Sequence, residues 1–260
     1  MKSNLVICGD AGKKLKKIQD NSVHLIYLDP PFFSERKFDS FNDKWKNDLG
    51  AYLNVMNNVL VQCKRVLRKD GSLYLHCDMH ASHYLKIELD KLFGRRNFRN
   101  EIIWKRHNAH NDTKQGAKGY GKIHDTIFHY SKSANFTWNP MYEQYPEEYI
   151  KKYYKYVEAE TGRKYALGDV SGPGGASKGN PRYSFRGVTR YYRFNKKKML
   201  QLYRAGKVVQ RKGLVPLQKR YLDEMPGIML QDIWTDIKSA QVLKKEDVGY
   251  STQKPLKLLE

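Results

Sequence analysis

The sequence is poor in cysteine and has no long apolar run. Its 260 residues include only three cysteines, Cys8, Cys63 and Cys77, and no two of them stand in C-x-x-C spacing. An odd count without that spacing argues against a disulfide framework and against a zinc ribbon. No apolar run is long enough to span a bilayer, and the first residues do not follow a signal-peptide pattern. We therefore expect a soluble, cytoplasmic protein that buries one large or two small cores.

Acidic residues are also scarce, with 27 Asp and Glu against 48 Lys and Arg. The formal net charge of +21 and a sequence pI near 9.7 indicate a polyanionic partner, and nucleic acid is the first candidate. Residues 151–222 concentrate the excess, with 19 Lys and Arg against three acids, a net of +16, and nine interleaved tyrosines. Cations contact phosphates and flat rings stack on unpaired bases, so this segment suits DNA or RNA. A solvated, lysine-rich surface is the alternative.

Strands and helices alternate over the first 133 residues. Apolar runs and helical spacing predict strands over 4–10, 23–28, 72–78, 100–107 and 124–132, and helices over 11–18, 51–67 and 82–93. Asp10 is a natural N-cap, Lys-Asp-Gly at 69–71 ends the second helix, and Gly94 ends the third. The alternation is typical of a doubly wound α/β layer. A polar, glycine-bearing loop at 108–122 separates the last two strands.

From residue 134 to residue 227 this alternation is lost. Met199, Leu202 and Tyr203 fit a short helix that ends at Gly206. The Gly/Pro/Ser-rich stretch at 171–181 is not a P-loop, because no Gly-Lys-Ser/Thr follows, and we interpret it as a mobile loop.

Residues 23–33, VHLIYLDPPFF, place an acid at the point where a strand ends. The apolar run is the pattern of an interior strand in a sheet that is covered on both faces. Pro30 and Pro31 stop the strand and hold the backbone rigid where it leaves the sheet. Ligands bind just outside the carboxyl ends of strands in open α/β sheets, so Asp29, with Phe32 beside it, is a candidate site.

Three stretches resemble the amino-methyltransferases of DNA. They are residues 9–33 with Asp-Pro-Pro-Phe at 29–32, residues 65–106, and residues 250–260 with Thr-Gln-Lys-Pro at 252–255. The order resembles the beta class, in which the catalytic motif precedes the target-recognition region. The resemblance implies a Rossmann-like, class I methyltransferase sheet formed by residues 1–133 and 231–260, with an inserted basic target-recognition region at 134–230.

The resemblance also implies a reaction: transfer of a methyl group from S-adenosylmethionine to the exocyclic amine of a flipped-out base in double-stranded DNA. The aspartate form of the motif favours adenine N6, and cytosine N4 stays open. Asp29 and the carbonyl of Pro30, kept rigid with Pro31, would accept hydrogen bonds from the amine, so that its nitrogen attacks the methyl group in line. Phe32 would stack on the base. A helix N-cap followed by a turn is the structural alternative for Asp29.

Cofactor contacts are implied at six positions. The resemblance assigns them to Gly9, Asp10, Asp29, Thr252, Gln253 and Lys254. An N-cap role for Asp10 and an ordinary helix start at Pro255 are equally compatible with the sequence. For DNA contacts, the density of cations and rings alone gives four candidates, Arg186, Arg190, Tyr191 and Arg193.

The segment HCDMHASH at 76–83 is dense in metal-ligand residue types. His76 and Asp78 share one face of a strand, whereas His80 and His83 fall in the turn and the helix that follow. No second ligand pair stands elsewhere at suitable spacing, so we expect no metal site.

The sequence ends before two strands and a glycine-rich turn that the family places in the middle of its sheet. We expect the 260 residues alone to bind cofactor poorly and to transfer methyl groups weakly or not at all, and a C-terminal segment or a second chain to complete the fold. The alternatives are a non-catalytic DNA-binding fragment or subunit and, from the basic region, an RNA methyltransferase. A restriction endonuclease is a further partner that the resemblance suggests.

Overall fold

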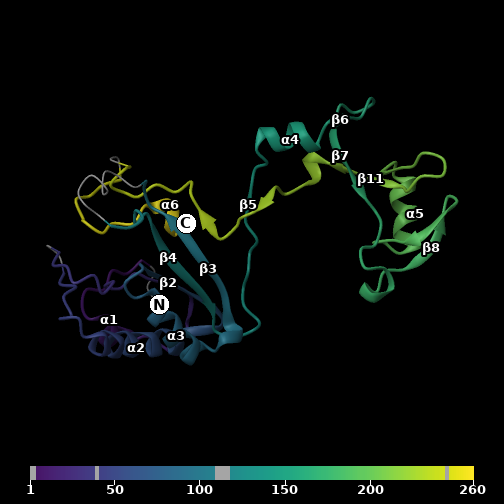
Figure 1. The fold of residues 1–260 in the computed structure, drawn as a ribbon. Coiled ribbons are helices and arrows are strands. Elements are labelled where there is room, and N and C mark those ends of the chain that lie inside the picture. Colours follow the sequence, from purple (N-terminus) through teal and green to yellow (C-terminus); the bar gives the residue numbers. More distant parts are fainter. Residues whose placement is uncertain (1–3, 39–40, 109–117, 244–245) are drawn as a thin grey trace. The chain divides into compact units, whose positions relative to one another are not determined.

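The computed structural model describes residues 4–38, 41–108, 118–243 and 246–260 (Figure 1). The chain separates into two compact units, one formed by residues 1–139 with 231–260 and the other by residues 140–230. No helix in the described ranges is long and apolar enough to cross a membrane.

The first unit is built on a five-stranded mixed sheet in the order β1-β2-β4-β3-β13. The strands are β1 (Val23–Leu28), β2 (Leu67–Cys77), β3 (Phe98–Lys105), β4 (His124–Ser131) and β13 (Ile233–Trp234). β1 runs parallel to β2 and β13 parallel to β3, while β4 is antiparallel to both of its neighbours. The helices are α1 (Ala11–Leu15), α2 (Leu49–Val66), α3 (Ser82–Phe93) and α6 (Leu256–Leu259), with a 3-10 turn η1 (Arg95–Asn97). The predicted layered α/β architecture is confirmed, and β4 makes the sheet mixed rather than wholly parallel.

Helices α2 and α3 cover one face of this sheet, below β2 and β4 in Figure 1. The apolar side chains of α2 recur at helical spacing, and Met56 and Leu60 are buried against β2. Asp48 begins α2, because its carboxylate accepts the Ala51 N–H at 2.9 Å. Gly94, with a φ of 87°, ends α3 as expected. Ile102, Trp104, Ile127, Ile237 and Leu258 form a second apolar cluster that joins β3 and β4 to the C-terminal segment.

Three local expectations about the first unit are wrong. Residues 4–10 form no strand, and Val6 is 99% exposed, since β1 lies at one end of the described sheet and no strand there pairs with this segment. For the same reason β1 is an edge strand whose Leu25 is 59% exposed, not one covered on both faces. Lys-Asp-Gly at 69–71 lies inside β2, where a Cβ on Gly71 would meet the His24 carbonyl oxygen at 2.8 Å.

The other predicted elements of the first unit are present with shifted ends. Helix α1 ends at Leu15 rather than at residue 18, and Asp10 is its N-cap, accepting the Lys13 N–H at 2.8 Å. The predicted strands at 100–107 and 124–132 correspond to β3 and β4. Most of the loop expected at 108–122 lies outside the described residues.

The second unit consists of short elements. Its strands form a four-stranded sheet in the order β10-β11-β7-β6, a β8-β9 hairpin and a β5-β12 pair. The elements are β5 (Tyr142–Glu143), α4 (Glu147–Tyr153), β6 (Tyr156–Val157), β7 (Lys164–Asp169), η3 (Gly175–Lys178), β8 (Arg182–Phe185), β9 (Val188–Tyr191), α5 (Lys196–Arg204), β10 (Val208–Val209), β11 (Leu217–Tyr221), η4 (Leu222–Glu224) and β12 (Ile228–Met229).

Helix α5 confirms the short helix expected near Met199. Met199 and Leu202 pack into a core with Val170, Phe185 and Tyr192, whereas Tyr203 is 38% exposed. The chain turns at Gly206, whose φ of 68° favours glycine. The stretch at 171–181 contains the 3-10 turn η3.

Candidate active site

A cavity of about 670 Å³ lies in the first unit, outside the ends of the strands β1, β2 and β3 and the start of β4. Its wall includes residues 29–32, 78–80, 104, 106–107, 124–125 and 250–254. Segments from both ends of the sequence therefore meet around one opening, which is the position where open α/β sheets bind ligands. The predicted Asp29, Pro30, Pro31 and Phe32 line it together.

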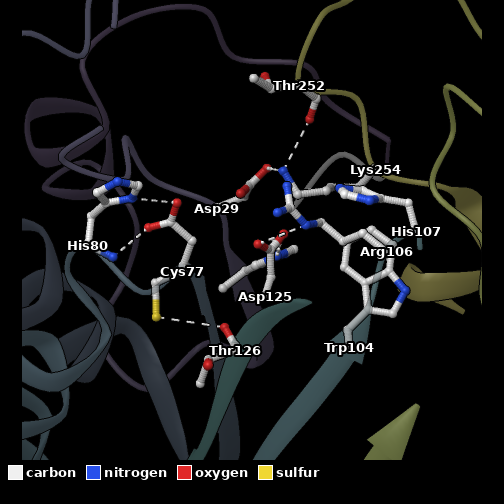
Figure 2. Close-up of polar contacts among 12 residues, drawn as sticks. Asp29, Cys77, His80, Trp104, Arg106, His107, Asp125, Thr126, Thr252 and Lys254 are labelled. Carbon is white, nitrogen blue, oxygen red and sulfur yellow. Dashed lines mark hydrogen bonds and ion pairs between the residues drawn. The ribbon is translucent and has the colours of Figure 1, made fainter. Parts of the chain in front are cut away.

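Asp29 is paired with a residue 225 positions away in the sequence. The Lys254 Nζ donates to Asp29 Oδ2 at 2.8 Å and to the Thr252 carbonyl oxygen at 3.1 Å (Figure 2). The same ammonium lies 5.2 Å from the centre of the Phe32 ring. The Lys254 side chain is only 12% exposed and that of Asp29 30%, so the pair is partly shielded from water. The two motifs predicted from the sequence thus meet through an ion pair.

A buried carboxylate, Asp43, holds the turn that follows the two prolines. Asp43 accepts the backbone N–H groups of Phe32, Phe33 and Ser34 at 3.2, 3.1 and 2.8 Å. It also accepts the Ser34 hydroxyl at 2.6 Å and the Trp45 indole N–H at 2.9 Å. Phe33 has a φ of 61°, a strained value for a side chain of its size, and these bonds hold the turn in that conformation.

Tyr52 on α2 fixes the same turn from its other side. Its hydroxyl donates to the Pro31 carbonyl oxygen at 2.9 Å, and burial raises its pKa. Sequence reasoning identified neither Tyr52 nor Asp43. Tyr52 is one apolar-face residue of an amphipathic helix among several, and Asp43 belongs to no motif, so no local signal marks either residue.

Behind Phe32 lies a fully buried histidine, His76 of β2. Its Nδ1 is hydrogen-bonded to the Tyr27 hydroxyl and its Nε2 lies 3.0 Å from Asp125 Oδ2. The Phe32 ring packs on the imidazole with 5.5 Å between the ring centres. Burial, followed by the charges of Asp29 and Asp125, raises the pKa of Tyr27. His76 is therefore a core residue that supports the wall of the cavity.

Within the segment 76–83, His80 and Asp78 contact each other, whereas the Cys77 thiol donates to the Thr126 carbonyl oxygen. His80 Nδ1 lies 2.8 Å from Asp78 Oδ2, and burial raises the pKa of the Cys77 thiol. No group of three or more His, Cys, Asp or Glu in the described part of the chain is placed to hold a metal ion.

Not every predicted site residue reaches the cavity. Thr252 and Gln253 line it, but the Gln253 amide is occupied in its own loop, donating to the Glu246 carbonyl oxygen at 2.6 Å and accepting the Val248 N–H at 2.9 Å. Gly9 and Asp10 are not on the wall of the cavity. Their assignment to the cofactor stays a prediction.

The four candidates for DNA contact lie in the second unit. Arg190 and Tyr191 are on β9, and Arg193 Nε donates to the Ser171 carbonyl oxygen at 3.0 Å. Arg186 is hydrogen-bonded to the Tyr203 hydroxyl, with its guanidinium 4.7 Å from the centre of that ring. The Arg182 guanidinium lies 5.9 Å from the centre of the Tyr191 ring. Three of the four candidates, Arg186, Tyr191 and Arg193, therefore have side-chain partners within their own unit.

Comparison with known proteins places this geometry in a family. The family model N6_N4_Mtase, described as DNA methylase, matches residues 23–260. The chain belongs to this DNA methylase family. The matched range contains the Asp-Pro-Pro-Phe motif, His76, Asp125 and Lys254, and with them the wall of the cavity.

Individual relatives of this methylase cover different shares of it. The type II methyltransferase M.EcaI of Enterobacter cloacae is 26% identical over 250 residues, which cover 94% of this chain and 54% of the relative. The DNA adenine methyltransferase YhdJ of Escherichia coli K12 is 33% identical over 135 residues, 52% of this chain and 43% of the relative. The solved structure of TTHA0409, from Thermus thermophilus, superposes with a TM-score of 0.42 and 16% identity, over 96% of this chain and 69% of that one. The methylase chain spans about half the length of the curated relatives it matches.

The cavity of this methylase fits the charges of S-adenosylmethionine, a ligand that carries a sulfonium, an ammonium and a carboxylate. Its volume lies in the range of small-molecule sites, and its wall carries both acids, Asp29 and Asp78, and cations, Arg106 and Lys254. The acids suit the sulfonium and the ammonium, and a cation on the wall suits the carboxylate. Asp10, which the resemblance assigns to the cofactor, does not line this cavity, so the fit rests on the residues of this wall alone.

Proposed function

We propose that this methylase transfers a methyl group from S-adenosylmethionine to the exocyclic amine of a base in double-stranded DNA, with adenine N6 favoured over cytosine N4. The observation that carries the proposal is the meeting of Asp29 and Phe32 with Lys254 at one cavity in a chain of the DNA methylase family. YhdJ, the relative named as a DNA adenine methyltransferase, supports the choice of adenine. The reaction would take place in the cytoplasm, on the DNA of the cell.

Asp29 would act on the amine as a hydrogen-bond acceptor. The lone pair of an aromatic amine is delocalised into the ring, so the nitrogen is a poor nucleophile until its N–H groups are held out of the plane. A carboxylate offers about four lone-pair sites, and Lys254 uses one of them at 2.8 Å. The others would accept one N–H of the amine, and the Pro30 carbonyl would accept the second. The bound cofactor supplies the methyl group.

Phe32 would hold the base. The amine is inaccessible inside a duplex, so the base has to leave the helix and enter the cavity. The Phe32 ring packs on the imidazole of His76, and the Phe32 backbone N–H donates to Asp43. The ring is therefore held in place before a base arrives. In the structure the Lys254 ammonium lies near this ring, and it would have to shift to admit a base stacked there.

The basic region at 134–230 would bind and recognise the DNA, with Arg186, Arg190, Tyr191 and Arg193 as candidates for contact. Its composition supports this role, with cations and tyrosines in excess over acids. The type III restriction-modification Mod subunit HindVI of Haemophilus influenzae is 30% identical over 182 residues, 65% of this chain and 24% of the relative. We therefore add a restriction subunit as a proposed partner, together with a further segment or chain that contributes to cofactor binding.

Tritium transfer from methyl-labelled S-adenosylmethionine to unmethylated DNA tests the proposal, followed by digestion to nucleosides that separates N6-methyladenine from N4-methylcytosine. Asp29→Asn should reduce the rate by a factor of about 100 or more. Asp70→Asn, at an exposed acid paired with Arg68, is the matched control and should not change it. DNA binding without methyl transfer in the wild-type chain, and after addition of the downstream segment, would identify a non-catalytic DNA-binding subunit instead.

A further inference from the structure

A row of polar side chains leads from the core of the first unit to Arg106 on the wall of the cavity. The Tyr27 hydroxyl is bonded to His76 Nδ1, and His76 Nε2 lies 3.0 Å from Asp125 Oδ2. The other oxygen of Asp125 lies 3.1 Å from Arg106 Nε (Figure 2). His76 and Asp125 are both buried, so this row is shielded from water until it reaches Arg106.

The direction of the hydrogen bonds follows from the residue types. An ionised carboxylate only accepts, so His76 carries its proton on Nε2 and donates to Asp125. Nδ1 then accepts from the Tyr27 hydroxyl, and the raised pKa of Tyr27 keeps that proton in place. The imidazole thus has one tautomer and one orientation, and the carboxylate beside Arg106 is held in one orientation.

The backbone of Arg106 is held on both sides. Its N–H donates to the Ile123 carbonyl oxygen at 2.9 Å and its carbonyl accepts the Ser239 N–H at 3.2 Å. Trp104, two residues earlier, makes a T-shaped contact with His76 and donates its indole N–H to the Ile237 carbonyl oxygen at 2.8 Å. Loop and strand therefore fix both the origin and the direction of the Arg106 side chain.

The guanidinium of Arg106 has donors to spare. Its side chain is 31% exposed and lines the same cavity as Asp29 and Phe32. The contact with Asp125 is an ion pair whose alignment falls short of a hydrogen bond, and within the described ranges the guanidinium makes no hydrogen bond to protein. A guanidinium carries five N–H donors and no acceptor, so it suits a ligand that presents acceptors.

The target base is such a ligand once its amine is taken by Asp29. Beside the amine, adenine presents only the acceptors N1 and N7, and cytosine presents N3. We propose that Arg106 donates a hydrogen bond to a ring nitrogen beside the amine of the flipped-out base, and that Asp125 and His76 are the positioning residues that aim it. The proposal rests on the proposed function, because that function brings a base into this cavity.

Deaza nucleosides test the proposal, because they replace one ring nitrogen by C–H and leave the amine intact. Binding to the 260-residue chain is measured by saturation-transfer NMR for deoxyadenosine with its 1-deaza and 7-deaza analogues, and for deoxycytidine with its 3-deaza analogue. Wild-type protein should bind one analogue about 10-fold or more weakly than its parent. Arg106→Met should bind parent and analogue alike, and Asp125→Asn should reduce the discrimination.

Two controls keep the outcome interpretable. Arg99→Met, at an arginine that contacts Ser131 and Ser133 away from the cavity, should discriminate as the wild type does. Arg106→Lys keeps the charge without the planar fork and should discriminate only weakly, which covers the case in which the methionine variant does not fold. Circular dichroism checks that each variant is folded.

The proposal is overturned if the wild type binds every analogue as well as its parent, or if a folded Arg106 variant still discriminates fully. Methyl transfer to DNA is measured on the same preparations, with and without the downstream segment. Loss of discrimination in the Arg106 variants, with no methyl transfer by the wild type even after addition of that segment, would support base reading and refute the proposed function. Methyl transfer by the wild type, without analogue discrimination, would support the proposed function and refute base reading by Arg106.

Discussion

Substitution of Asp43 by asparagine should destabilise the first unit strongly, because one side chain satisfies five donors. Oδ1 accepts the Phe33 N–H and the Trp45 indole N–H, and Oδ2 accepts the N–H of Phe32 and both the N–H and the hydroxyl of Ser34. In asparagine one of these oxygens becomes an NH2 group that faces two or three other donors. Each hydrogen bond to a charged acceptor contributes about 1.5–3 kcal/mol, and an orphaned buried donor costs about 1–3 kcal/mol.

The contributions are not additive, and the desolvation of the Asp43 carboxylate offsets part of them. We expect a loss of about 2–4 kcal/mol in the free energy of unfolding for Asp43→Asn and more for Asp43→Ala. Urea titration followed by far-UV circular dichroism measures it, and hydrogen exchange of the peptide spanning 30–45 should show faster exchange at the freed amides. Methyl transfer should fall with it, since the same amides hold Phe32 in place.

Asp48→Asn is the matched control for the same chemical change. Asp48 caps α2 through one bond, to the Ala51 N–H at 2.9 Å, and asparagine caps a helix about as well as aspartate. This variant should change the unfolding free energy by less than about 0.5 kcal/mol. The reasoning about Asp43 would be refuted if Asp43→Asn matched Asp48→Asn within about 1 kcal/mol and left the exchange of 30–45 unchanged.

Three further predictions concern titration, the ion pair and the thiols. Burial lowers the pKa of His129 to about 4, so in the folded protein this imidazole is protonated only well below pH 6.5, the pKa of an exposed histidine. The free energy of unfolding should stay constant above pH 6.5 and fall by up to about 3 kcal/mol as the pH drops from 6.5 to 4. In a pH series of urea titrations, His129→Gln should flatten that part of the curve. Lys254→Met removes the partner of the motif aspartate and should lower kcat/KM about 10-fold or more while Lys254→Arg retains most of it, and equal activity of all three proteins would contradict the role of the pair. Burial raises the pKa of the Cys63 thiol to about 11 and that of Cys77 as well, whereas Cys8 is exposed, so Ellman's reagent should titrate one thiol in the folded protein and three in urea.

Local rules of the sequence were sufficient for the elements that short-range interactions determine. Helix α3 and its glycine end, helix α2 with its apolar face, and the strand that precedes the two prolines all depend on residues within a few positions of one another. The motif at 29–32 and the lysine at 254 could both be picked out, because each belongs to a short pattern. The α/β architecture of the first unit follows from the alternation of such elements.

Residues 4–10 and 69–71 show where local rules fail. An apolar run becomes a strand only when a neighbour supplies its hydrogen bonds, and residues 4–10 have no such neighbour in the described sheet. Lys-Asp-Gly has the composition of a turn, yet it lies inside β2, in the irregular part of the pairing between Leu67 and Ser72, where Gly71 allows the close approach of the His24 carbonyl oxygen. In both cases the pairing of the neighbouring backbone, and not composition, decided the structure.

By itself the sequence determined which residues carry the chemistry of the motif, and it left their surroundings open. Only the tertiary structure decided that Lys254 meets Asp29, that Asp43 ties the turn after the prolines, and that Arg106 stands on the cavity wall at the end of a buried row. The physical reason is distance along the chain: a contact between side chains many residues apart leaves no periodic or local signal, because the packing of whole strands and helices sets it.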